Sequence, residues 1–283
     1  MAGQVADYEI TSIVADHGPL PCLRARRPPR LGDSAAQATI WVLGPLARTA
    51  WTVARARLGP VAAVRSAGLP DWLEAGVGEW GQRPAVWVSA ATAVTGTLAA
   101  PPPDLDMPSR LRAVASAARG AHALHEHGQL HGAICPQAVA LTAPDRAGQA
   151  APAPGTGVSE AVLAPPSLAN GETLLAQVGY PPLAYMDPQL LRGEGGRWSD
   201  VWALGATIQR VVIGSAPFPG IEEDDLPVVQ ALAQLLLAPV PARREMPAPI
   251  ASLVAACLET DPADRPATAE EVARGLEVAA ANW

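Results

Sequence analysis

Residues 1–90 alternate short apolar runs with polar turns, at the spacing expected of β-strands. Runs rich in β-branched and aromatic residues lie at 8–14, 22–26, 38–43, 71–77 and 84–90, separated by segments rich in Pro and Gly. Residues 48–68 have helical composition, and we expect Gly59-Pro60 to interrupt that helix. This part of the chain therefore predicts a small antiparallel sheet with one helical stretch.

After residue 108 the apolar spacing becomes helical. Leu111, Val114, Ala118 and Ala121 recur on one face of a helix over 109–128. A second helix follows Ser199, a candidate N-cap, with a stripe of Val201, Leu204, Ile208 and Val211 or Val212. Thr268 and Glu271 stand at capping-box spacing before the last helix. The second part of the chain is thus predicted to be mostly helical.

One long segment shows neither the alternation of a strand nor the apolar spacing of a helix. Residues 143–170 are rich in Ala, Pro and Gly and show no regular apolar spacing. We predict a long mobile loop there. Whether this 143–170 loop is phosphorylated is left open by the sequence.

Composition narrows the class of protein. A chain of 283 residues with 49% hydrophobic content can bury one large core or two small ones. Its formal net charge of −7 opposes the phosphate neutralisation on which nucleic-acid binding depends, so no nucleic-acid partner is expected. No leader pattern and no apolar run long enough to cross a bilayer is present, which predicts a soluble, cytoplasmic protein without a membrane span.

Two residue types affect the possible chemistry. The three cysteines are widely spaced and form no C-x-x-C pair, which favours reduced structural thiols. All 20 basic residues are Arg, so no mechanism that needs a Lys side chain is available.

Four segments, in order along the chain, carry a resemblance to a known family. They are "LHEHGQLHGAICPQAVAL" at 124–141, "YMDPQLL" at 185–191, "SDVWALGATIQRVVIGSAPFPG" at 199–220 and "DPADRPATAEEV" at 261–272. They resemble the catalytic loop, the end of the activation segment, the central helix of the large lobe and the loop before the last helices in bacterial Ser/Thr protein kinases of eukaryotic type. The resemblance implies a two-lobed α+β kinase-like fold, with a small antiparallel-sheet lobe over 1–90 and a larger helical lobe over 91–283.

The catalytic loop lacks the family's working groups. The family has His-Arg-Asp, a Lys two residues later and an Asn three residues after that, which serve as base, cation and magnesium ligand. The matching positions here hold His131, Gly132, Ala133, Cys135 and Ala138. The resemblance therefore assigns no catalytic residue to this loop.

The nucleotide-binding positions are equally depleted. Prolines in "ADHGPLP" at 15–21 remove backbone N–H groups where the glycine-rich loop should be. Trp41 stands where the resemblance places the phosphate-binding Lys, and no Asp or Glu occurs between Ser34 and Pro70 to supply its helix partner. No Asp-Phe-Gly follows Leu141. No cofactor and no metal site are expected.

Three residues are expected to anchor the large lobe by resemblance. Asp200 should bond to the backbone of the catalytic loop. Arg265 should meet the end of the activation segment at Gln189, where the family has a Glu. Since Gln can accept a hydrogen bond but carries no charge, this contact should be weaker than the family's ion pair.

Three other features each allow two interpretations, and a fourth, the set of Trp residues, has one simple interpretation. His122, His125 and His127 could hold a metal, but they also fit an ordinary helix end in this family. "EEDD" at 222–225 is either a docking patch or a solvated helix start. Arg24, Arg26, Arg27 and Arg30 could bind a phosphorylated partner or form a charged strand face. Trp41, Trp51, Trp72, Trp80 and Trp87 are most simply the core of the small lobe.

The sequence therefore predicts a pseudokinase. It would bind a protein partner, such as a true kinase or a phosphopeptide-binding domain, as a scaffold or allosteric regulator in signalling. The alternative is a nucleotide-binding switch, or an unorthodox transferase that uses the remnant ATP cleft. The partner, the upstream signal and the oligomeric state cannot be read from the sequence.

Overall fold

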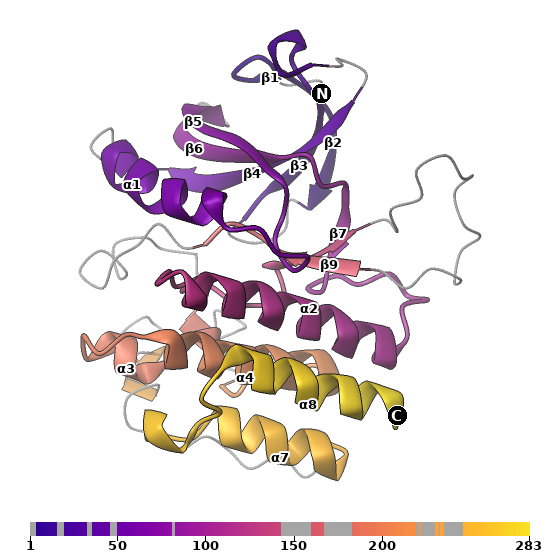
Figure 1. Ribbon diagram of the computed structural model, residues 1–283, viewed down its shortest axis with the longest axis vertical. Helices are drawn as coiled ribbons and strands as arrows, with labels where there is room; N and C mark the ends of the chain where they lie inside the picture. The colour runs from indigo at the N-terminus through magenta and orange to yellow at the C-terminus, as the bar shows by residue number, and fades with distance from the viewer. Residues whose placement is uncertain are drawn as a thin grey trace.

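The computed structural model describes residues 4–15, 20–32, 36–45, 50–80, 83–142, 160–166, 183–218, 221, 230–231, 233–234 and 246–283. Within these residues the chain forms two lobes, one built on a sheet and one built mainly from helices (Figure 1). The sequence segments "ADHGPLP" (in part) and "EEDD" lie outside the described residues, as do 143–159 and 167–170.

The small lobe is a six-stranded antiparallel sheet with the order β1-β2-β3-β4-β6-β5. Its elements are β1 (Gln4–Val5), β2 (Tyr8–Ala15), β3 (Cys22–Arg26), β4 (Gln37–Pro45), α1 (Ala50–Ala63), β5 (Trp72–Trp80) and β6 (Arg83–Ala90), with a 3-10 turn at Pro29–Leu31. Each strand run predicted from the sequence is confirmed. Figure 1 shows α1 lying beside the part of the sheet that carries β4, β5 and β6.

Alternation along β4 divides the small lobe into two apolar clusters. Trp41 and Leu43 point to the side that also packs against α1 and the large lobe. Ile40 and Val42 point to the other side and join a second cluster with Tyr8 and Trp87. The interpretation of the five Trp residues as core packing is confirmed, because Trp41 and Trp87 are buried and Trp51, Trp72 and Trp80 pack partly buried against these clusters.

Helix α1 runs without a break through Gly59-Pro60, so the predicted interruption is wrong. Pro60 removes one helical N–H donor, but Leu58 and Val61 on either side are buried in the core. Tertiary packing of these side chains outweighs the local penalty.

The large lobe stacks its helices beneath the sheet (Figure 1). The helices are α2 (Met107–Glu126), α3 (Pro188–Leu191), α4 (Arg197–Ile213), α7 (Ala248–Cys257) and α8 (Ala269–Ala281), with 3-10 turns at Leu183–Tyr185 and Pro262–Asp264. A second antiparallel sheet, β7 (Val94–Thr97), β8 (Val139–Thr142) and β9 (Glu160–Leu163), lies between the two lobes. The predicted apolar stripes of α2 and α4 are confirmed as buried or partly buried faces.

Three local predictions meet different outcomes. Thr268 caps α8, with its hydroxyl accepting the Glu271 N–H at 3.3 Å, as expected. The N-cap of α4 is Gly196 and not Ser199, because the helix already begins at Arg197; the Ser199 hydroxyl, inside the first turn, donates to Asp187. The prediction of one unstructured loop over 143–170 is wrong for residues 160–163, which pair with β8 as β9.

No helix among the described residues is both long and apolar enough to span a bilayer. The cytoplasmic location expected from the sequence stays a prediction.

Candidate functional site

The segment 131–138, between α2 and β8, is fixed by a buried carboxylate of α4. Asp200 accepts the backbone N–H groups of His131 at 2.9 Å and Gly132 at 2.7 Å. The ring Nε2 of His125, on α2, lies 2.8 Å from the same carboxylate. Burial alone raises the pKa of Asp200, but the bonds from His125 and from the His131 backbone outweigh it and lower the pKa below its usual value. Asp200 therefore ties α4, α2 and the loop together as an anion.

His131 connects the loop to the end of β9. Its Nε2 lies 2.8 Å from the carbonyl oxygen of Ala164, and its Nδ1 accepts the N–H of Ala133 at 3.2 Å. These partners require the neutral tautomer with the proton on Nε2. Complete burial lowers the pKa of His131 to about 4, so the ring is neutral at pH 7.

The three positions that should carry the chemistry are apolar and closed to solvent. Ala133 is 1% exposed, and Cys135 and Ala138 are 0% exposed. Burial raises the pKa of Cys135 to about 12, so its thiol keeps its proton. Ala133 and Ala138 therefore carry no titratable group, and the Cys135 thiol is neutral.

The described residues that follow β9, Ala164 to Pro166, include no carboxylate. The β8–β9 hairpin leads directly into Ala164-Pro165-Pro166, and the bond from His131 fixes the Ala164 carbonyl next to the loop. In the family that the sequence resembles, a magnesium-binding Asp-Phe-Gly is expected between Leu141 and Tyr185, and the sequence has none there. Across the part of the chain that the structure describes, no cluster of three His, Cys, Asp or Glu could hold a metal ion.

Trp41 occupies the inner face of β4 at the position expected for a Lys. Its side chain is 0% exposed and packs edge-on against Trp72, with ring centroids 5.7 Å apart. Its indole N–H is buried and has no hydrogen-bond partner among the residues that the structure describes. A bulky apolar group therefore fills the place where a phosphate-binding amine would stand.

Helix α1 presents a cation, and not a carboxylate, to the interface between the lobes. The Arg57 guanidinium donates from Nη2 to the carbonyl of Leu130, just before the loop, at 3.5 Å. Burial lowers the pKa of Arg57, while the charge of Asp200 acts in the opposite direction. Arg57 therefore links α1 to the loop through a carbonyl and not through a carboxylate.

The segment that joins the lobes uses its polar backbone groups internally. Thr39 donates its hydroxyl to the carbonyl of Thr92 at 2.7 Å and accepts the N–H of Val94 at 3.2 Å. Arg24 donates to the carbonyl of Val94 at 3.0 Å. The N–H of Ala91 is bonded to the carbonyl of Asp71. An adenine ring would have to displace these bonds to use the same groups.

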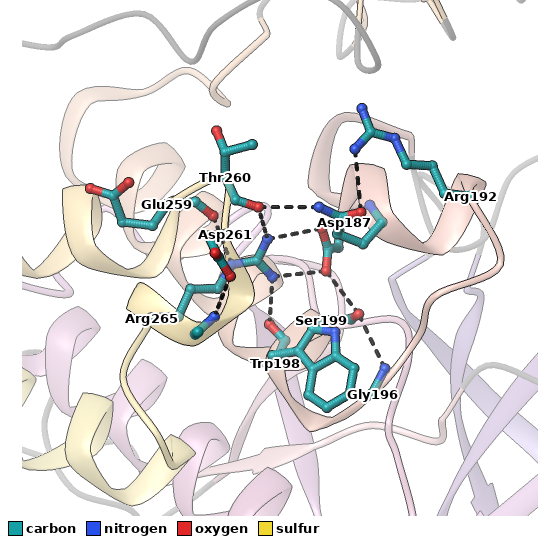
Figure 2. A network of polar contacts seen from close by, with 11 residues as sticks. Asp187, Arg192, Gly196, Trp198, Ser199, Glu259, Thr260, Asp261 and Arg265 are labelled. Carbon is teal, nitrogen blue, oxygen red and sulfur yellow. Dashed lines mark hydrogen bonds and ion pairs between the residues drawn. The ribbon is translucent and has the colours of Figure 1, made fainter.

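A second buried carboxylate, Asp187, anchors the large lobe next to the same loop (Figure 2). Its carboxylate accepts hydrogen bonds from both terminal nitrogens of the Arg265 guanidinium, at 2.8 and 3.2 Å, and from the Ser199 hydroxyl, at 2.8 Å. Arg265 further donates to the carbonyls of Glu259 and Trp198. Its guanidinium lies 5.0 Å from the ring centre of Trp202.

The expected partner of Arg265 is therefore wrong. Gln189 does not bond to Arg265; its side-chain amide donates to the Thr260 carbonyl at 3.2 Å and its oxygen lies 3.4 Å from Arg192. Asp187, two residues earlier, reaches Arg265 because it is the N-cap of the short helix α3 and its carboxylate turns inward. The ion pair is kept at a shifted position, which the aligned motif alone did not reveal.

The histidines near the end of α2 and the Arg residues of the small lobe do not form the ligand sites that the sequence left open. His125 bonds to Asp200, whereas His127 bonds to the carbonyl of Ala123 within its own helix, so these two residues do not share a site. The importance of His125 was missed, although its place one turn before the loop was visible in the sequence.

Each Arg of the small-lobe set already has a partner within the protein. The partners are the Val94 carbonyl for Arg24, Glu9 for Arg26, the Gln37 carbonyl for Arg27, and Asp7 and Glu74 for Arg30. This favours the charged strand face over a phosphate site.

Comparisons with known proteins agree with this geometry. The family model described as protein tyrosine and serine/threonine kinase matches residues 86–274, more than half of the chain. Among solved structures, the chain is similar to the PknI kinase domain of Mycobacterium tuberculosis, with a TM-score of 0.65 over 98% of both chains. At 18% sequence identity this likeness shows the fold, with its antiparallel-sheet lobe and helical lobe, and nothing about activity.

Proposed function

We propose that this chain, which belongs to the protein tyrosine and serine/threonine kinase family, is a pseudokinase that acts by binding and transfers no phosphate. Its partner would be a protein, such as a true kinase or a phosphopeptide-binding domain, which it would scaffold or regulate allosterically.

One observation carries the proposal. The residues at the positions of the base, the cation and the metal ligand are Ala133, Cys135 and Ala138, and all of them are apolar or neutral and closed to solvent. A positioned base contributes on the order of 10²- to 10⁴-fold to a rate, and the metal and phosphate contacts supply much of the rest. No group at these positions can replace either contribution.

The nucleotide side of the site supports the same proposal. Trp41 fills the Lys position, the sequence has no Asp-Phe-Gly, and Thr39 with Arg24 takes up polar groups of the connecting segment. Phosphate recognition would therefore have no Lys and no metal-bound carboxylate, and adenine would have to displace the bonds that Thr39 and Arg24 make to the connecting segment.

The features that stabilise the large lobe are retained. Asp200 and Asp187 each satisfy several buried donors, and removing such a carboxylate leaves those donors unpaired. A family member that keeps its structural carboxylates and loses its catalytic ones retains a defined surface for a partner.

The direct test is a phosphotransfer assay with labelled ATP, Mg²⁺ or Mn²⁺, and a generic protein substrate. We expect no incorporation into the chain or into the substrate. Labelling that follows the purified chain through further columns, and that is lost in Cys135→Ala, would overturn the proposal, because it would show chemistry at the loop. Labelling that separates from the chain identifies a contaminating kinase.

A further inference from the structure

The sheet of the small lobe ends in two edge strands of unequal length. β1 has two residues, whereas β5 has nine and pairs only with β6 among the described strands. Proteins usually shield a long edge strand with Lys, Pro or a bulge, because its free N–H and C=O groups can pair with another strand. From Glu74 to Trp80, β5 has no register shift, no Lys and no Pro. This edge can therefore accept another strand.

The pairing with β6 fixes which backbone groups of β5 face outward. Residues of an antiparallel pair alternate between hydrogen-bonded and non-hydrogen-bonded positions, and the second kind directs its N–H and C=O away from the partner strand. Glu79 stands opposite Pro84, which has no N–H, so this pair is of the second kind. Ala75 and Val77 precede Glu79 at steps of two in the same register. These three residues therefore present their N–H and C=O groups at the outer edge.

The three outward positions are symmetric about Val77. When two copies of β5 meet antiparallel with Val77 on the two-fold axis, Ala75 of each copy stands opposite Glu79 of the other. Every outward N–H and C=O of these residues then has a partner, because all three positions form hydrogen-bonded pairs. No like charges stand opposite each other in this register. The edge is thus complementary to itself.

The side chains of β5 suit this pairing on both faces. Val77 is 56% exposed and would be covered by Val77 of the second copy. On the other face, a Cβ on Gly76 would lie 2.5 Å from the Trp87 ring, and the Ala6 nitrogen of the β1–β2 turn lies 4.0 Å from the Cβ position of Gly78. A strand added here must be small on this crowded face. A second β5 meets that condition, because its own two glycines lie there.

We propose that β5 is an interface between two copies of this chain, in which the two β5 strands pair antiparallel about Val77 and join two six-stranded sheets into one. The proposal goes beyond the loss of phosphotransfer and does not depend on it, because β5 contains none of the loop residues 131–138. Pairing along an edge buries little area, so the dimer should be weak, with a Kd on the order of 0.1 mM.

Sedimentation equilibrium measures this association. The average mass of the wild type should rise from that of one chain towards that of two as the protein concentration passes through the Kd. Val77→Glu should weaken the dimer at least about tenfold, because like charges would stand directly opposite each other. Val77→Pro is a second blocking variant, since it removes an outward N–H that β6 does not use. Val278→Glu, at an exposed position of α8, is the matched control and should associate as the wild type does.

Two results would overturn the interface. One is a wild type that stays monomeric at about ten times this Kd, which would leave the edge to a strand of another protein. The other is association of a folded Val77→Glu or Val77→Pro variant that equals the wild type, which would place the contact elsewhere.

Engineered cysteines test the register. The native cysteines are buried, so a thiol added at the edge reacts alone. The Cα atoms of a hydrogen-bonded pair lie about 5.5 Å apart, within the range that a disulfide spans. Val77→Cys should therefore form a disulfide-linked dimer with oxidised glutathione. Glu79→Cys alone should not, because its counterpart in the second copy lies about four residues further along, roughly 13 Å away.

A double variant completes the register test. Ala75→Cys/Glu79→Cys should form the disulfide-linked dimer that neither single variant forms, because these two positions face each other across the axis. Glu79→Cys that cross-links as efficiently as Val77→Cys would refute the symmetric register.

Discussion

Asp187 and Asp200 are both buried carboxylates of the large lobe, and they differ in what neutralises them. Asp187 faces the full positive charge of Arg265, while Asp200 is held by backbone N–H groups and by His125. A buried ion pair is costly to break from one side, because the remaining charge has no counterion. At the scale of single residues, this difference predicts where substitution destabilises the lobe most.

Asp187→Ala should lower the free energy of unfolding by about 3–5 kcal/mol, since Arg265 would stay buried without its carboxylate. Urea denaturation followed by circular dichroism measures it. Gln189→Ala is the matched control and should cost about 1 kcal/mol, because it loses the bond to the Thr260 carbonyl. The double variant Asp187→Ala/Gln189→Glu places the acid at the family's position and should recover part of the loss. Equal costs for the two single variants would contradict the shifted ion pair.

His131 predicts a pH dependence of stability. An ordinary His has a pKa near 6.5 in the unfolded chain, whereas burial lowers the pKa of His131 to about 4 in the folded one. As the pH falls from 6.5 to 4, His131 binds a proton in the unfolded state but stays neutral in the folded state. The free energy of unfolding therefore decreases by up to about 3 kcal/mol. Urea titrations at pH 7.5, 6 and 5 should show this slope, flattened in His131→Gln and retained in the exposed control His127→Gln.

At the scale of elements, apolar spacing predicted most of what formed. The strands that contain Ile10, Leu23 and Ile40 and the stripes of α2 and α4 follow directly from alternation or helical period, because one face of each element is buried. Strand β9 was not predicted, since its four residues follow a long Ala/Pro/Gly segment and gain their order from pairing with β8. Asp187 was missed for a related reason: the motif position named Gln189, and only the turn of α3 decides which side chain reaches Arg265.

One contact between elements depends on two glycines. The loop from α1 to β5 crosses α2 where Gly68 meets Gly120, and the Gly68 carbonyl also accepts the N–H of Leu163 in β9. A Cβ on Gly68 would overlap the Ser116 carbonyl oxygen and lie 2.6 Å from the backbone nitrogen of Gly120. The small lobe can therefore rest on α2 and β9 here only if residue 68 has no side chain.

Gly68→Ala should destabilise the protein by about 1–3 kcal/mol, because the atoms that the new methyl group meets are backbone and cannot turn aside. Thermal unfolding measures the change. Gly96→Ala in β7 is the control, since a Cβ there meets no atom within 4 Å, and it should stay within about 0.5 kcal/mol of the wild type. A Gly68→Ala variant as stable as the control would mean that the crossing is looser than described.

At the scale of the whole molecule, one apolar cluster runs through both lobes. It includes Trp41 and Val88 from the sheet, Leu141 and Leu163 from the strands between the lobes, and Leu204 from α4. Cys135 and Ala138, which stand at the positions of the family's catalytic Lys and magnesium-binding Asn, belong to the same apolar cluster.

Trp41 is the residue at which this packing and nucleotide binding compete. Trp41→Ala should destabilise the protein by about 3–5 kcal/mol, as expected for a large aromatic side chain removed from a core, whereas Trp283→Ala, at an exposed position, should change stability little.

In calorimetry, millimolar ATP with Mg²⁺ should give no heat with the wild type. Trp41→Ala should not bind ATP tightly either, because the space it opens still lacks a Lys and a magnesium ligand. Micromolar, magnesium-dependent binding by the wild type would refute this account and favour a nucleotide switch. Weak, metal-independent binding would mean that adenine displaces the bonds made by Thr39 and Arg24 without phosphate recognition, and binding to a protein partner would remain the proposed function.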